Sequence, residues 1–242
     1  MTWRDSLDDR QRTEVEFAQI YVGKFNHGPA EHDRLTLIDR LAGLLDAVGT
    51  GLPKPDYFIL NVPYHSQHED DAQKYRRDCG PACVEMLGKY YQPDSTVTTD
   101  KIMTLITGGS DRSIYIKELQ DAAQFFFGVE LERYDNAGWE DLKQWVEGEG
   151  KPVIVLGHYD SLRTRMDRGW LKGHYGVVVG FDWVKYQNEI IERAIIHDPD
   201  YYAGLHAQGA FIPLVKDHFM AFWDDCHKDT NPRCMALVPG GE

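Results

Sequence analysis

The stretch KYRRDCGPACVEMLGKYY, residues 74–91, places two cysteines four positions apart at the start of an amphipathic segment. Pro81 suits the first turn of a helix, where a missing N–H group costs no hydrogen bond. The apolar residues that recur with helical spacing are Ala82, Met86, Leu87 and Tyr90. The pattern therefore predicts a helix that begins near Cys79 and buries one face.

The two cysteines of this segment have different surroundings. A thiol at a helix N-terminus feels the positive end of the helix dipole and unpaired N–H groups, and both favour the nucleophilic thiolate. We therefore interpret Cys79 as a nucleophile and Cys83, one turn further on, as a core residue. For a cysteine on its own the structural interpretation would prevail, because free cysteine is among the most buried residue types. The assignment depends on whether the chain supplies a base.

Two downstream segments supply a base and a group to orient it. In KGHYGVVVGFD, residues 172–182, His174 stands at the entrance of an apolar strand. In AIIHDPD, residues 194–200, Asp198 follows the end of a second strand. Adjacent antiparallel strands can bring a histidine at one strand start beside an aspartate at the other strand end, as an oriented imidazole requires. His158, in VLGHYD, is the rival base, but the residues after it have the character of a loop.

The elements VPYHSQ, DCGPAC, GHYGVVVG and HDP occur in that order between residues 62 and 199. Over roughly residues 57–200 the chain resembles the bacteriocin-leader-processing cysteine peptidases and their stand-alone relatives in the papain-like superfamily. The resemblance implies an α+β fold in which a catalytic helix packs on an antiparallel sheet. It also implies a Cys79 nucleophile, a His174 base and an Asp198 orienter, a peptide or protein substrate, and no metal or organic cofactor.

The resemblance further implies a glutamine before the nucleophile that donates to the oxyanion. Gln67 belongs to the VPYHSQ element, whereas Gln73 has the closer spacing to Cys79. An amide side chain can reach the oxyanion from either position if the loop folds back. Both glutamines remain candidates, with a slight preference for Gln67.

The sequence divides near residue 52. Residues 1–52 carry apolar residues at helical spacing, and GTGLPKP, residues 49–55, then stops the helix and acts as a linker, which predicts a helical N-terminal appendage. A pro-segment that blocks a cleft is the alternative. Residues 53–242 are expected to form the peptidase-like domain. Helices are expected in 113–127 and 139–150, and strands in 57–64, 151–160, 173–183 and 189–200, in the order of an α+β domain.

Composition excludes several classes of protein. The net charge of −13 argues against a nucleic-acid partner, which usually meets a basic face. No signal-peptide pattern and no long apolar run is visible, so we expect a cytoplasmic location and no membrane partner.

Cys226, His227 and Cys234 are potential zinc ligands, but one cluster without a second ligand pair is weak evidence for zinc. Cys226 and Cys234 are expected to be free thiols, with a disulfide between them as the alternative.

These observations predict a cysteine peptidase that cleaves a peptide or isopeptide bond through a thioester intermediate. One alternative keeps the same residues but carries out deamidation or a transglutaminase-like transfer. Nucleotide chemistry, as in a related family described as guanylyl cyclases, lacks support because no glycine-rich phosphate loop is present. A non-catalytic binding module is the alternative from another class. Its thiol would show no unusual reactivity.

Overall fold

The structure is a computed structural model that describes residues 57–68, 75, 77–158, 173–186, 189–200, 209–224 and 233–240. The predicted helical segment 1–52 lies outside these residues. The elements in chain order are β1 (Tyr57–Ile59), α3 (Cys79–Tyr91), α4 (Thr99–Thr107), α5 (Ile116–Phe127), β2 (Leu131–Tyr134), α6 (Trp139–Lys143), the π-helical turn η3 (Gln144–Gly148), β3 (Val153–His158), β4 (Gly173–Tyr186), β5 (Glu189–His197), β6 (Ile212–Val215), α8 (Lys216–Asp224) and β7 (Met235–Pro239).

The described strands form one seven-stranded sheet in which every pairing is antiparallel. Its order is β2-β7-β3-β4-β5-β6, and β1 pairs separately with β4. β3 pairs with the first part of β4, over Gly173–Val178, and β1 pairs with the later part, over Gly180–Asp182. The predicted α+β class with an antiparallel sheet is confirmed.

A β-bulge interrupts β4 between Val178 and Gly180. The extra residue, Val179, turns its carbonyl to the N–H of Leu60 at 2.7 Å. A Cβ atom on Gly180 would lie 2.2 Å from the carbonyl oxygen of Phe58, so only glycine lets β1 approach this closely. The bulge is therefore the point at which the strand beside β4 changes from β3 to β1.

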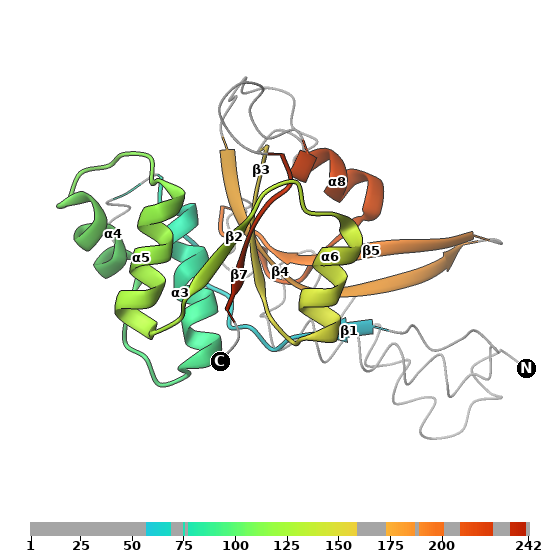
Figure 1. Cartoon of the computed structure of the whole chain (residues 1–242), viewed down its shortest axis with the longest axis horizontal. Coiled ribbons are helices and arrows are strands. Elements are labelled where there is room, and N and C mark those ends of the chain that lie inside the picture. Colours follow the sequence, from blue (N-terminus) through green and yellow to red (C-terminus); the bar gives the residue numbers. More distant parts are fainter. Residues whose placement is uncertain are drawn as a thin grey trace, which may run out of the picture.

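Helix α3 begins at Cys79, as the sequence predicts, and its residues from Gly80 to Gly88 are buried. It packs against α5 and β4. A Cβ atom on Gly80 would lie 3.0 Å from the Leu119 side chain and 3.2 Å from Tyr175, so a glycine at this position lets the helix start sit close to β4. In Figure 1, α3, α4 and α5 stand together to the left of the sheet, and α6 and α8 stand on the other side, where the β4–β5 hairpin extends beyond them to the right.

Several short elements were not predicted from the sequence, namely α4, β2, β6, α8 and β7. In addition, the single helix expected over 139–150 is divided between α6 and the wider turn η3. The start of α4 does carry a recognisable signal, because the side chain of Thr98 accepts a hydrogen bond from the backbone N–H of Lys101.

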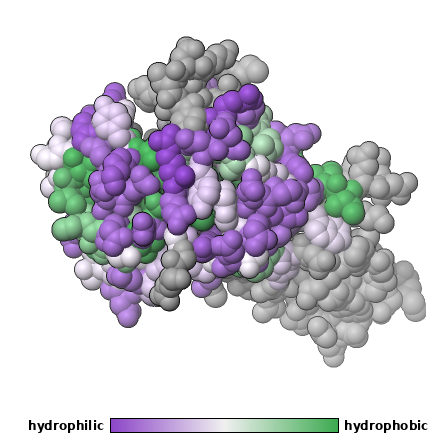
Figure 2. Space-filling view, in the orientation of Figure 1, coloured by the Kyte–Doolittle hydropathy of each residue, from purple (hydrophilic) through white to green (hydrophobic). Residues whose placement is uncertain are grey.

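The surface in the orientation of Figure 1 is largely hydrophilic, and apolar residues gather over the helices at the left and at the far end of the β4–β5 hairpin (Figure 2). Phe125 of α5 and Ile190 of β5 are 71% and 68% exposed. Across the described ranges, no helix combines the length and the apolar character that a membrane crossing requires.

Candidate active site

Cys79 is the first residue of α3, and it is partly exposed. Cys83 lies one turn further on and is fully buried in the core. Burial, reinforced by the charges of Cys79 and Asp198, raises the pKa of the Cys83 thiol well above its usual range. Of the two cysteines, Cys79 is therefore the accessible one.

His174 and Asp198 form a buried pair. His174 is the second residue of β4, and Asp198 follows directly after β5. The Nε2 atom of His174 lies 2.7 Å from Oδ1 of Asp198. Burial alone lowers the pKa of His174, but the charge and hydrogen bond of Asp198, with a hydrogen bond and charge from Cys79, raise it to about 10. The structure thus brings Cys79, His174 and Asp198 together, and the ring is protonated at neutral pH.

The Asp198 carboxylate is held in place from its own turn. Besides the His174 ring, its Oδ1 atom accepts the backbone N–H of Asp200 at 3.0 Å. The Asp198 backbone N–H donates to the carbonyl of Gly209 at 2.8 Å. A Cβ atom on Gly209 would lie 2.0 Å from the Asp198 carbonyl oxygen, so the chain can pass this close to Asp198 only with a glycine at position 209. The carboxylate is fixed before any substrate binds.

The loop that carries Gln67 runs beside the same turn. Ser66 Oγ and the N–H of Gln67 both donate to the carbonyl of Pro199, at 3.3 and 3.0 Å. His68 Nε2 lies 2.6 Å from Oδ1 of Asp200. Gln67 is largely buried, and its Oε1 atom is buried without a hydrogen-bond partner among the described residues. Gln73, the other candidate donor, lies outside the described residues.

A buried carboxylate in α3 anchors this loop and α4 to the helix. Glu85 is fully buried, and its Oε2 atom accepts hydrogen bonds from Thr99, through the backbone N–H and through Oγ1 at 2.7 Å. Lys89 forms an ion pair with the other carboxylate oxygen. His65 Nε2 lies 3.4 Å from Oε2, which is an ion-pair distance rather than a short hydrogen bond. The loop that carries Gln67 is thereby held from two sides, through His65 by α3 and through Gln67 by the turn after Asp198.

Comparison with known proteins identifies the family and the fold of the chain. The sequence model of the "Peptidase_C39 like family" matches residues 59–230, which is most of the chain. The chain belongs to the Peptidase C39-like family. A solved structure from Bacillus anthracis, described as a C39-like peptidase, superposes with a TM-score of 0.52 at 17% identity, and the match covers 77% of this chain and 98% of that one. The fold of this C39-like chain is therefore papain-like, as the sequence predicts.

A second structure, described as UfSP from C. elegans, aligns with a TM-score of 0.49 and 14% identity. That match covers 78% of this chain but 35% of the longer protein. No curated protein matches the chain.

The neighbouring histidines of this C39-like chain differ in their roles. His197 accepts the Phe211 N–H at Nδ1 and therefore donates from Nε2 to the carbonyl of Val62, each at 3.0 Å, which fixes a neutral ring. His158, the rival base, ends β3 and pairs with Gly173. The ring whose pKa responds to both Cys79 and Asp198 is that of His174.

The side chains that hold the turn after Asp198 were not predicted from the sequence, although two of them lie within the VPYHSQ element. Tyr64 donates to the Asp198 carbonyl at 3.1 Å, and Ser66 and His68 contact the residues that follow. Tyr64 and Ser66 lie in VPYHSQ, and His68 follows it directly. The whole VPYHSQ element, and not its glutamine alone, therefore indicated where these contacts would be. Cys226 and His227, two of the three potential zinc ligands, lie outside the described residues.

Asp78 is a further buried acid beside Cys79. It is 3% exposed and precedes α3, but its side chain does not cap the helix. Its Oδ1 atom is buried and has no hydrogen-bond partner within the described part of the chain. Burial raises the pKa of this carboxyl to about 7, against the lowering effect of a backbone hydrogen bond and of His68. Asp100 and Asp111 add to the increase.

Proposed function

We propose that this chain is a cysteine peptidase that hydrolyses a peptide or isopeptide bond with Cys79 as nucleophile, His174 as acid and base, and Asp198 as the residue that orients His174. One observation carries the proposal: a partly exposed thiol at the start of α3 bonds to a buried histidine whose Nε2 atom is held at 2.7 Å by a carboxylate. Membership of a peptidase-like family and the papain-like fold support the same reaction class.

In the proposed reaction, the thiolate of Cys79 attacks the carbonyl carbon of the scissile bond and forms a tetrahedral intermediate. His174, protonated at neutral pH, then gives its proton to the departing amine, and the thioester remains. A water molecule attacks the thioester after His174 takes its proton. The acid product leaves, and Cys79 is regenerated. Asp198 keeps the ring aligned and stabilises its charged form throughout.

The oxyanion is the remaining charge to be stabilised. The backbone N–H of Cys79 lies at the helix start, where N–H groups have no partner within the helix. We assign the second donor to the Gln67 amide, because its loop is bonded to Pro199 beside Asp198 and is anchored to α3 through Glu85. Gln67→Ala should then lower kcat about 10²–10³-fold, the effect typical of removing one oxyanion donor. Gln73→Ala, made in parallel, should have little effect.

The test of the proposal has two parts, labelling and turnover. The full chain is treated with limiting iodoacetamide at pH 6.5, digested, and mapped by mass spectrometry. We expect modification at Cys79 and none at the buried Cys83. Turnover is then followed on a mixture of peptides and isopeptides by detection of new amino termini or released lysine amines, and Cys79→Ala should abolish it.

The matched control is Cys83→Ala, which removes the neighbouring core thiol and should keep turnover in the folded fraction. Labelling of Cys83 in preference to Cys79 would reverse the assignment of the nucleophile. Release of ammonia without new amino termini would show that the same site deamidates rather than cleaves. A folded chain that shows neither selective labelling nor turnover would indicate a binding module.

A further inference from the structure

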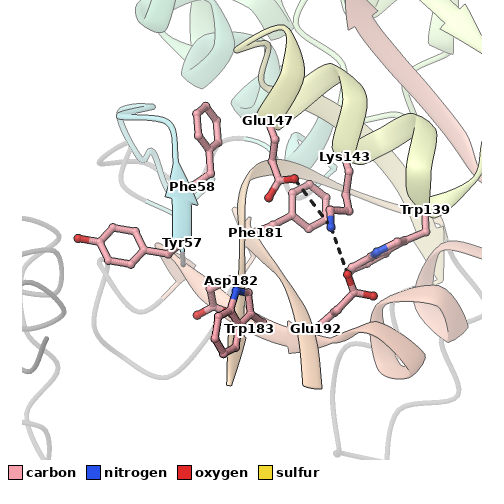
Figure 3. Close-up of a pocket in the computed structure, with 9 residues that line it drawn as sticks. All are labelled: Tyr57, Phe58, Trp139, Lys143, Glu147, Phe181, Asp182, Trp183 and Glu192. Atoms are coloured by element: carbon pink, nitrogen blue, oxygen red, sulfur yellow. Dashed lines mark hydrogen bonds and ion pairs between the residues drawn. The ribbon is translucent and has the colours of Figure 1, made fainter. Parts of the chain in front are cut away.

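A pocket that does not include Cys79 lies between β1, the α6–η3 segment and the β4–β5 hairpin. It has a volume of about 370 Å³ and is lined by five aromatic and four charged side chains (Figure 3). One lining residue, Asp182, lies eight positions after His174 on the same strand. At about 3.3 Å per residue this separates the pocket from the candidate active site by roughly 26 Å.

The charged groups of the pocket are unequally paired. Arg193 Nε lies 2.7 Å from Oδ1 of Asp182. The Glu192 carboxylate receives the ammonium groups of Lys143 and Lys216, each at 3.1 Å.

Glu147 is the exception. Its one ion pair among the described residues is a 3.9 Å approach of Lys143, too long for a hydrogen bond. Burial raises the pKa of Glu147, with Glu192 and Glu140 adding to the increase and Lys143 opposing it. This carboxylate is therefore a group that an additional cation would stabilise.

Aromatic rings line the same pocket as Glu147. In Figure 3, Glu147 lies over Phe181 and faces Lys143, whereas Tyr57 and Phe58 stand on the β1 side and their rings point away from Glu147. Aromatic faces attract cations, and a planar guanidinium also stacks on them. Glu147 belongs to the π-helical turn η3, an irregularity that occurs frequently at functional sites.

A hydrogen-bond donor in the same pocket also lacks an acceptor. Trp139 is 6% exposed, and its Nε1 atom is buried without a partner among the described residues. Figure 3 shows this nitrogen on the side of the ring that faces Lys143 and Glu192. An indole N–H needs an acceptor such as a carbonyl oxygen. The pocket thus offers a counter-ion for a cation, Glu147, and a hydrogen-bond donor for a carbonyl oxygen, Trp139. A basic residue within a peptide carries both a cation and a carbonyl oxygen.

We propose that this pocket binds the side chain of an arginine residue of a peptide, with the guanidinium between Glu147 and the aromatic rings and a peptide carbonyl on Trp139 Nε1. The net charge of −13 attracts such a basic peptide at long range. The ammonium of Lys143 lies 3.1 Å from Glu192 and 3.9 Å from Glu147, so in this proposal the guanidinium approaches Glu147 from the side away from Lys143. The proposal is independent of the reaction assigned to Cys79.

The test follows the indole N–H signals of Trp139 and Trp183 by NMR in the full chain, during titration with Nα-acetyl-arginine N-methylamide. The signals are assigned from Trp→Phe variants. We expect saturable shifts with blocked arginine and none with blocked norleucine, whose shorter alkyl side chain carries no charge. Glu147→Gln should weaken the binding of blocked arginine about tenfold or more, as expected for the loss of a charged hydrogen bond.

The matched control is Glu149→Gln, two residues further on, whose carboxylate pairs with Lys151 at 2.8 Å and does not line the pocket. It should leave binding unchanged. Equal binding of norleucine, the absence of saturable shifts, or an unaffected Glu147→Gln variant would overturn the proposal. Equal affinity for n-propylguanidine would assign the site to small guanidinium compounds and would refute the role given to the peptide carbonyl.

Discussion

Replacing Asp78 by asparagine should stabilise the protein, and the gain should grow with pH. Burial raises the pKa of Asp78 from 3.8 to about 7, so folding favours the protonated carboxyl. The contribution of Asp78 to stability is therefore complete below pH 3.8 and is lost as the pH rises towards and through 7. At about 1.4 kcal/mol per pKa unit, the difference between 3.8 and about 7 corresponds to about 4 kcal/mol. The Asp78→Asn substitution would remove that pH-dependent loss, because an amide does not ionise.

The measurement is urea unfolding of both proteins at pH 4 and at pH 8. The free energy of unfolding of the Asp78→Asn variant, relative to the unmodified chain, should be about 4 kcal/mol higher at pH 8 than at pH 4. The control is Asp94→Asn, an exposed carboxyl in the turn after α3, which should change stability by less than about 0.5 kcal/mol at either pH. If the difference in the free energy of unfolding between the Asp78→Asn variant and the unmodified chain is the same at both pH values, the Asp78 carboxyl is charged in the folded protein.

Three further changes test other parts of the structure. With a pKa of about 10, His174 stays protonated between pH 6 and pH 8, so His174→Ala should slow iodoacetamide labelling of Cys79 at pH 6 about tenfold or more, and Asp198→Asn should slow it less. Equal rates in all three proteins would contradict the pairing. Glu85→Ala should lower the free energy of unfolding, measured by urea titration, by about 3–5 kcal/mol. The control Glu140→Ala, at an exposed position, should change it by less than about 0.5 kcal/mol. We propose that residues 1–52 form a helical appendage, whose removal should expose apolar surface and cause aggregation by light scattering, whereas a soluble and more active remainder would indicate a pro-segment.

The parts of the fold that the sequence predicts are those with strong local signals. Cys79, Gly80 and Pro81 mark the start of α3, and the helical spacing after them fixes its buried face. The proximity of His174 and Asp198 could be predicted because one stands at a strand start and the other at a strand end.

Other features depend on partners that the local sequence does not identify. β7 is a buried run of five residues, too short to distinguish a strand from a helix, and it pairs with β2 about a hundred positions earlier. The bracing of Gln67 rests on the carbonyl of Pro199, and any residue type presents such a carbonyl. The π-helical turn that carries Glu147 has no residue signature that separates it from α6.

The bulge at Val179 makes β4 more sensitive to a change in its length than to substitutions. Side chains alternate between the two faces of a strand, so one extra residue reverses the alternation beyond it. His174 stands before the bulge, and Phe181 and Asp182, which line the pocket beside Glu147, stand after it. Deleting Val179 would turn one half of β4 over relative to the other and disrupt either the His174–Asp198 pair or the pocket. Substitutions along this strand act on one site at a time, whereas a change in its length acts on both.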